Sequence, residues 1–91
     1  MKTLEYERLT IYEVEALSKE LNSYLDNAEL TLDLDLKNVT KLDLSAIQLL
    51  LSTERTCSQN NIKFNLHGLN STNKEALQLC GCAPFLGVAD E

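Results

Sequence analysis

Three aspartates stand close together in the middle of the chain, and paired carboxylates are a common basis for metal-assisted chemistry. Asp33 and Asp35 lie two residues apart in an alternating segment, and Asp43 follows further along. Carboxylate oxygens are the ligands that Mg²⁺ prefers. Side chains two residues apart on a strand point to the same face, so Asp33 and Asp35 are expected on a solvent-exposed face. No lysine that could support an acyl phosphate is evident beside them, and we expect no catalytic residue here.

Thiols and the only histidine are the other groups that could bind a metal. Cys80 and Cys82 flank a single glycine, while Cys57 and His67 lie on separate predicted elements. Two thiols alone do not make a tetrahedral zinc site, and nothing visible brings Cys57 and His67 to them. We therefore predict a structural role for Cys80 at a helix end and a surface position for His67. The expectation is no metal site and no cofactor.

Hydroxyl groups gather where a helix is predicted to begin. Asp43 is a good N-cap, and Thr40 and Ser45 lie on either side of it. The first N–H groups of a helix lack intrahelical partners and carry partial positive charge, so this position tolerates a phosphate. Ser45 is thus a candidate phosphorylation site, and the alternative is that its hydroxyl only satisfies backbone groups at the helix start.

The elements that would position these residues follow from periodicity. Residues 4–7, 30–36 and 62–67 alternate between apolar and polar side chains, which is typical of strands with one buried face. A sheet covered on both faces would show continuous apolar runs instead. We therefore expect one face to be wet and to carry four polar side chains: Asp33, Asp35, Lys63 and His67.

Three helices are predicted between and after the strands. The first follows the capping-box sequence from Thr10 to Glu13; the second starts at Asp43 and fades near residues 60–61; the third runs from residue 70 or 71 to Cys80. Gly81 would end the third helix, Pro84 would open a short turn, and a last strand would lie near residues 86–89. The order β-α-β-α-β-α predicts an α/β fold, a mostly parallel four-stranded sheet packed by helices.

Composition limits the functional classes. The 91 residues, with 44% apolar and 24% charged side chains, predict a single folded domain spanning 1–91. No apolar run is long enough to cross a bilayer, and three cysteines without a secretion signal fit the cytoplasm. The formal charge of -6 disfavours nucleic acid, because no cluster of Lys and Arg is present to bind phosphates. A protein partner is the better expectation.

Four segments, in their order and spacing, resemble the STAS domain, the family of bacterial anti-sigma-factor antagonists. They are Leu9-Thr-Ile-Tyr-Glu-Val14, Asp35-Leu-Lys-Asn-Val-Thr40, Leu42-Asp-Leu-Ser-Ala-Ile-Gln-Leu-Leu-Leu51 and Glu75-Ala-Leu-Gln-Leu-Cys-Gly81. The resemblance implies a non-catalytic regulatory module that docks to a signalling protein, such as an ATP-binding anti-sigma kinase or a chemotaxis-type complex. In the family a phosphorylatable Ser or Thr follows the aspartate, and here that place is taken by Leu44. The alternative is an unswitched structural accessory subunit of a larger complex, such as a lipid transporter.

The second helix also predicts a docking surface without reference to the family. At 100° per residue, Leu44, Gln48, Leu51 and Arg55 fall on one stripe, nearly opposite the apolar stripe that would face the core. Exposed leucines beside a glutamine resemble a small protein-binding surface, although single exposed leucines are common on any protein. The predicted partner-binding residues are Thr40, Asp43, Leu44, Ser45, Gln48 and Leu51.

Overall fold

The computed structural model describes residues 1–28 and 30–79. The elements in chain order are β1 (Lys2–Thr3), β2 (Arg8–Leu9), α1 (Val14–Asn27), β3 (Thr31–Asp35), β4 (Lys41–Leu42), α2 (Leu44–Gln59), β5 (Lys63–His67) and α3 (Ser71–Leu79). Expectations for Cys80, Gly81, Cys82, the Pro84 turn and a strand near residues 86–89 lie outside the described residues.

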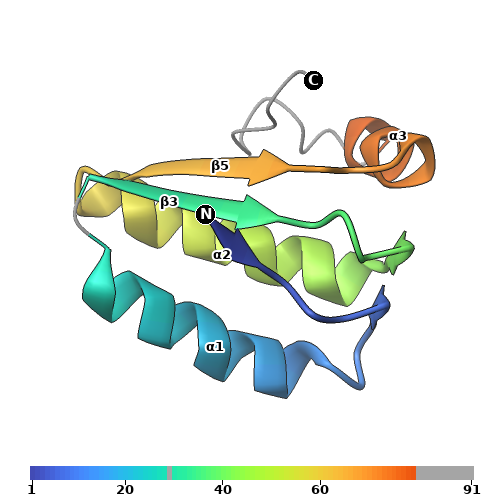
Figure 1. Cartoon of the computed structure of the whole chain (residues 1–91), viewed down its shortest axis with the longest axis horizontal. Coiled ribbons are helices and arrows are strands. Elements are labelled where there is room, and N and C mark those ends of the chain that lie inside the picture. The colour runs from blue at the N-terminus through green and yellow to red at the C-terminus, as the bar shows by residue number, and fades with distance from the viewer. Residues whose placement is uncertain (29, 80–91) are drawn as a thin grey trace.

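All strand pairs in the described ranges are parallel, and they form two sheets. The larger sheet has the order β1-β3-β5, and the smaller one pairs β2 with β4 (Figure 1). The predicted α/β class and the parallel pairing are confirmed, while the strands are arranged differently from the single four-stranded sheet that the sequence suggested.

The first predicted strand, residues 4–7, is wrong in its bounds. Two short strands lie on either side of it instead, because the chain changes partners there. The Leu4 N–H still donates to the Asp35 carbonyl at the end of β3 (3.0 Å), whereas the Glu7 carbonyl already accepts the Thr40 N–H just before β4 (2.7 Å). Residues between these two bonds cross from the larger sheet to the smaller one.

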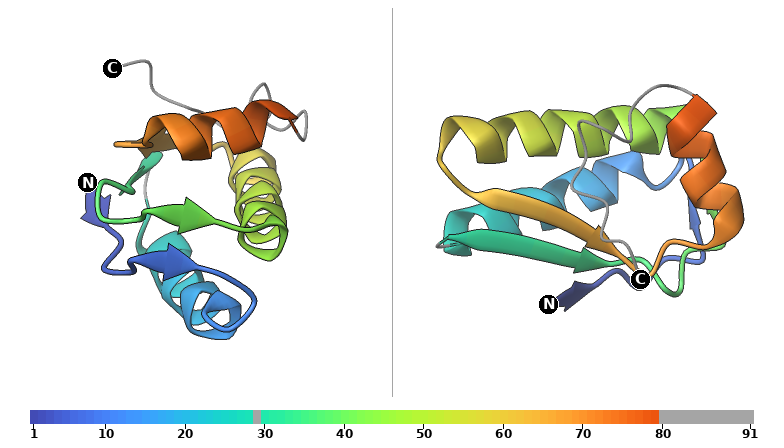
Figure 2. Two further views of the ribbon diagram at one scale, coloured as in Figure 1. Left: turned by 90° about the vertical axis from the view of Figure 1, so that its right-hand side faces the viewer. Right: turned by 90° about the horizontal axis from the view of Figure 1, so that it is seen from above.

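Alternation along β3 and β5 divides the larger sheet into an apolar and a polar face. Leu32 and Leu34 of β3, with Phe64 and Leu66 of β5, are buried on the face that α1 and α2 cover (Figure 2). The residues between them, with the exposed Lys63, project from the opposite face, as the sequence predicted. The core therefore lies between this sheet and the two long helices.

The helix starts follow local side-chain bonding. At Asp43, Oδ1 accepts the N–H of Ala46 at 3.1 Å, so the predicted N-cap of α2 is confirmed. Before α1, the Thr10 N–H donates to Glu13 Oε1 at 2.9 Å, which is half of the predicted capping box, and the Thr10 hydroxyl donates to the same oxygen at 2.7 Å. The helix itself begins only at Val14, so residues 10–13 form a separate turn.

Candidate docking surface

Asp43 joins two segments that are far apart in the sequence. Its Oδ1 caps α2, and its Oδ2 accepts the Ile11 N–H from the turn of residues 10–13 at 3.0 Å. The Asp43 N–H in turn donates to the Leu9 carbonyl at the end of β2 (3.0 Å). Charge-assisted bonds from one carboxylate to two backbone N–H groups are strong for their size. Asp43 therefore fixes the turn beside the first residue of α2.

Three large apolar side chains are exposed at this end of the molecule. Leu44, the first residue of α2, is 60% exposed, Ile11 is 66% exposed and Tyr12 is 89% exposed. We call Ile11, Tyr12 and Leu44 the apolar tip. Figure 2 (left) looks onto this end, where the turn lies beside the start of α2. Exposure of several large apolar groups in one place is unusual for a surface that remains in water.

The sequence prediction found Leu44 but missed Ile11 and Tyr12. That prediction used the helical periodicity of α2, which says nothing about residues outside this helix. Ile11 and Tyr12 belong to the sequence from Thr10 to Glu13, which was interpreted only as a capping box. Because the side chains of Thr10 and Glu13 bond each other, the turn closes between them and leaves its two middle residues outside. The available signal was that neither middle residue belongs to the apolar stripe of α1.

The remaining predicted residues of α2 divide between surface and core. Gln48 is exposed and Ser45 is half-buried, while Leu51 is half-buried and packs against the core. The prediction that Leu51 forms an exposed stripe with Leu44 is therefore wrong. Leu51 lies in the middle of α2, where the helix packs on the core, whereas Leu44 lies in the first turn at the end of the molecule. The predicted core face is confirmed, with Leu49 half-buried and the others buried: Ala46, Ile47, Leu50, Thr53 and Cys57.

A buried asparagine of α3 holds the segment that leads into α2. Asn73 is only 1% exposed; its Nδ2 donates to the Val39 carbonyl and its Oδ1 accepts the Leu42 N–H, both at 3.1 Å. The same side chain thus satisfies backbone groups on both sides of Thr40. Nothing in the sequence pointed to Asn73, because an asparagine inside a helix has no pattern that predicts a distant backbone partner.

Thr40 is exposed, but its hydroxyl already has a partner. Its Oγ1 donates to the Glu7 carbonyl at 2.9 Å, and its own carbonyl accepts Asn70 Nδ2 at 3.2 Å. Thr40 therefore helps to hold β2 and β4 together as well as lying at the surface.

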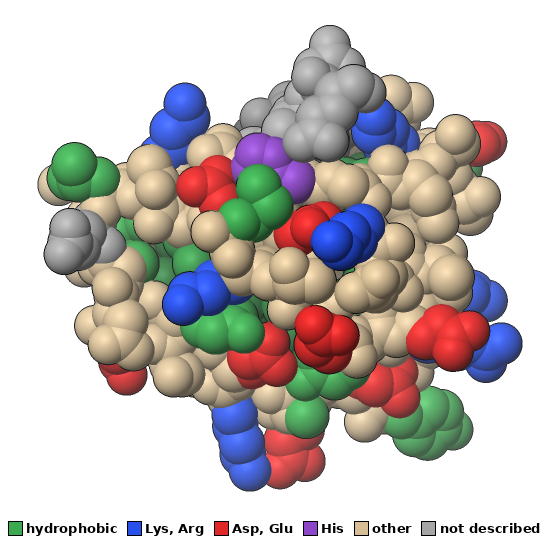
Figure 3. All heavy atoms as spheres, viewed as in Figure 1, with side chains coloured by type: hydrophobic (Ala, Val, Ile, Leu, Met, Phe, Trp, Pro, Cys, Tyr) green, Lys and Arg blue, Asp and Glu red, His purple; other side chains and the backbone are tan. Residues whose placement is uncertain are grey.

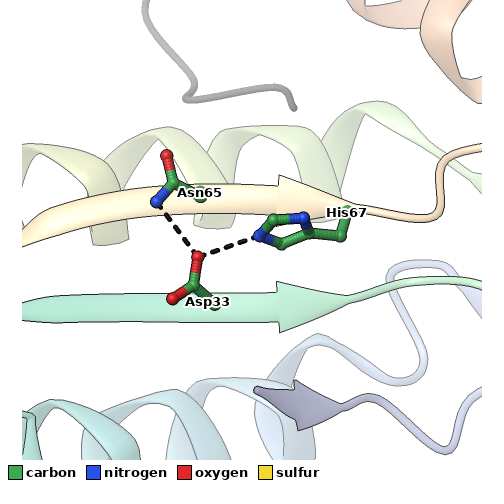
Figure 4. Close-up of polar contacts among 3 residues, drawn as sticks. All are labelled: Asp33, Asn65 and His67. Atoms are coloured by element: carbon green, nitrogen blue, oxygen red, sulfur yellow. Dashed lines mark hydrogen bonds and ion pairs between the residues drawn. The ribbon is translucent and has the colours of Figure 1, made fainter. Parts of the chain in front are cut away.

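Asp33 makes a polar cluster on the other face of the larger sheet (Figure 4). Its Oδ1 accepts Asn65 Nδ2 at 3.0 Å and lies 2.8 Å from His67 Nε2. These hydrogen bonds, that of His67 first, hold the pKa of Asp33 below its usual range. His67 was predicted as a plain surface residue, but its side chain is only 19% exposed and joins β5 to β3. The cluster is a link between strands.

Within residues 1–28 and 30–79, no three His, Cys, Asp or Glu side chains are placed to hold a metal ion together. Cys57 is buried, and this burial raises the pKa of its thiol, which makes the reactive thiolate scarcer. Across the same residues no helix has the length and apolar character to cross a bilayer.

Comparison with known proteins identifies the class. Residues 6–87 match the family model described as "Mlab, STAS domain", and the chain therefore belongs to the STAS domain family. The family that the sequence resemblance implied is thus confirmed. No match is found among curated proteins.

Two solved structures have a similar fold. A crystal structure of a candidate anti-sigma factor antagonist from Thermotoga maritima superposes with a TM-score of 0.83 at 18% identity, covering 98% of this chain and 78% of that one. A solution NMR structure of the same protein gives a TM-score of 0.80 at 18% identity, covering 97% and 70%. At this identity the likeness establishes the shared fold.

Proposed function

We propose that this STAS module is a non-catalytic protein that regulates a cytoplasmic partner by docking through the apolar tip and the first turn of α2. The contact surface includes Thr40, Ser45 and Gln48 around Leu44. Asp43 stabilises this surface through its hydrogen bonds to the N–H groups of Ile11 and Ala46. Suitable partners are signalling proteins such as an ATP-binding anti-sigma kinase or a chemotaxis-type complex. The observation that carries the proposal is the exposure of three large apolar side chains at one end of the molecule, where Asp43 ties the turn of residues 10–13 to the start of α2.

Energetics support this surface. Burial of apolar area contributes about 25 cal/mol per Å², and a few central residues usually supply most of the binding free energy of an interface. Leu44 stands in the first turn of a helix that Asp43 caps, so its backbone is already ordered before a partner covers it.

The second candidate function is an unswitched accessory subunit of a larger complex, such as a lipid transporter. Leu44 favours it, because a leucine has no hydroxyl to be phosphorylated at the place where the family carries its switch. Ser45 is the nearest alternative acceptor, and it is half-buried in the first turn of α2. Intact-mass measurement after incubation with the partner kinase separates the two: a gain of one phosphate that is lost in Ser45→Ala supports a switch.

The docking proposal is tested with two leucine variants. Leu44→Asp places a charge in the apolar tip, while Leu30→Asp does the same at another exposed leucine, 77% exposed, just before β3. An aspartate in the first turn of α2 also suits the helix dipole, so Leu44→Asp is expected to fold normally. Wild type and both variants serve as baits in a native lysate, and bound proteins are quantified by mass spectrometry.

We expect at least one protein from the lysate to bind to the wild-type and Leu30→Asp baits but not to the Leu44→Asp bait. With that protein purified, the Kd should rise at least about 30-fold in Leu44→Asp, the size of a hot-spot loss. Equal capture by all three baits would contradict the proposal. A large fall in the melting temperature of Leu44→Asp alone would show that Leu44 belongs to the core.

A further inference from the structure

Two cations stand side by side on the small sheet next to the apolar tip. The register of β2 and β4 places Arg8 directly opposite Lys41, and Leu9 opposite Leu42. Both leucines are buried, so the alternation along each strand sends Arg8 and Lys41 outward on the same face, where both are exposed. Neighbouring strands are only about 5 Å apart, so the two cationic side chains start from adjacent positions on the sheet.

This pair has no internal partner in the described structure. Within residues 1–28 and 30–79, no ion pair joins Arg8 or Lys41 to a carboxylate, although Glu7 is adjacent in the sequence. Asp43 is close in sequence to Lys41, but its two oxygens already accept the N–H groups of Ala46 and Ile11. Like charges directly opposite each other on a sheet are destabilising, so the pairing costs stability and brings no internal bond in return.

The position of the pair relates it to the docking surface. Arg8 lies three residues before Ile11, and Lys41 lies three residues before Leu44, so each strand leads from a cation to a member of the apolar tip. Figure 3 shows Lys and Arg side chains protruding at the end of the molecule where β2 and β4 lie, with acidic and apolar side chains nearby. The cations therefore border the surface that a docked partner would cover.

We propose that Arg8 and Lys41 form a carboxylate-binding pair that reads acidic side chains of the docked protein while the apolar tip binds its apolar residues. The proposal rests on the proposed function, since it needs a partner at this end. A neighbouring pair of cations matches one or two carboxylates on a protein surface. Such charged contacts at an interface rim set register and association rate more than total affinity.

The overall charge of the chain argues for a protein as the anionic partner. With a net charge of -6, the whole molecule is repelled by extended anionic surfaces such as nucleic acids and acidic membranes. A contact between two local cations and a few carboxylates acts at short range, within the screening length of about 8 Å at physiological salt. An acidic protein segment is therefore the occupant that the charges favour.

The test uses Arg8→Gln/Lys41→Gln, with Lys19→Gln/Lys63→Gln as the matched control. Lys19 and Lys63 are exposed cations of α1 and β5, and the control removes the same amount of charge. The probe is the purified protein that Leu44→Asp fails to capture. Its Kd is measured for wild type and both double variants over a series of NaCl concentrations, and melting temperatures are recorded in parallel.

The expected result has three parts. The Arg8→Gln/Lys41→Gln variant binds roughly three- to tenfold more weakly at low salt, its Kd depends less on NaCl, and it melts at or above the wild-type temperature. The control matches wild type in Kd. A melting temperature below that of wild type would show that the pair serves the fold, and would overturn the inference.

The failures of the two proposals are distinguishable. If the partner is captured through Leu44 but binds both double variants like wild type, only the carboxylate-binding pair is refuted. If no protein depends on Leu44, both proposals fail. Sedimentation with vesicles of phosphatidylglycerol and phosphatidylcholine is the remaining arm: binding that requires Arg8 and Lys41 would overturn a protein partner in favour of an anionic lipid.

Discussion

Removal of the buried Asn73 side chain should be among the substitutions that most reduce the free energy of unfolding of this domain. Asn73→Ala deletes the bonds to the Leu42 N–H and the Val39 carbonyl, and both of those residues are buried. Two lost hydrogen bonds cost about 1 kcal/mol each, and a buried donor left without a partner adds about 1 kcal/mol or more. We therefore expect a loss of about 3 kcal/mol, out of the roughly 5–15 kcal/mol that holds a typical domain together.

The loss is measured by urea unfolding, followed by circular dichroism, with Gln78→Ala as the control on the exposed side of α3. For a domain of this size, about 3 kcal/mol corresponds to a fall in the melting temperature on the order of 12–24 °C. A loss below about 1 kcal/mol in Asn73→Ala would refute the reasoning, because it would mean that water or a shifted backbone satisfies both groups.

A second variant isolates the amide donor. Asn73→Asp keeps the volume and the acceptor for Leu42 but turns the donor to Val39 into a carboxylate facing a carbonyl. Burial and this contact should raise the pKa of the new carboxyl in the folded state. Its protonated form can donate again, so the penalty relative to wild type should be small below the ordinary carboxyl pKa of about 4 and should grow as the pH rises through the folded pKa. A pH-independent penalty would contradict the assigned role of the donor.

Two further predictions concern the polar face of the larger sheet and the turn after it. Gly68 has a φ of +72°, and a Cβ there would lie 2.5 Å from Asp35 Oδ1 and 2.9 Å from the backbone nitrogen of Lys37. Gly68→Ala should therefore lower the free energy of unfolding, measured with urea, by about 2 kcal/mol. A near-neutral result would show that the turn relaxes freely. Asp33→Asn should lose about 1 kcal/mol at neutral pH. Because the folded pKa of Asp33 is lowered, its contribution exists above the unfolded carboxyl pKa and vanishes as the pH falls through the folded value, so the two proteins should converge in stability under acid; curves that stay parallel would exclude this linkage.

The parts of the fold that the sequence predicted are those with local causes. The helix start at Asp43 depends on bonds within three residues, and the faces of β3 and β5 follow from alternation alone. The bounds of the N-terminal strand were predicted wrongly, because the division into β1 and β2 depends on which strand lies beside each residue. Leu4 bonds to the end of β3 and Glu7 to the start of the smaller sheet, and no local pattern in residues 4–7 records that change.

The docking surface was predicted only in part for the same reason. Helical periodicity correctly predicted that Leu44 is exposed. Leu51 lies on the same stripe of α2 and still packs against the core, because periodicity gives the direction of a side chain but not which part of the fold lies in that direction. Ile11 joins the surface through a bond to Asp43, 32 residues away in the sequence. Asn73 likewise acts on backbone groups more than 30 residues away. Contacts of this kind appear only when the chain is folded.

The bonding of Asp43 bears on how such a surface could be regulated. In a helix start whose N–H groups are free, an added phosphate finds donors that stabilise its charge. Here Asp43 already takes the N–H of Ala46 and that of Ile11, and a phosphate on Ser45 would add about -1.5 to -2 charge close to this carboxylate. Repulsion between them would weaken the bond that ties the turn of residues 10–13 to α2. In this chain, therefore, a phosphate on Ser45 would act on docking by loosening the apolar tip.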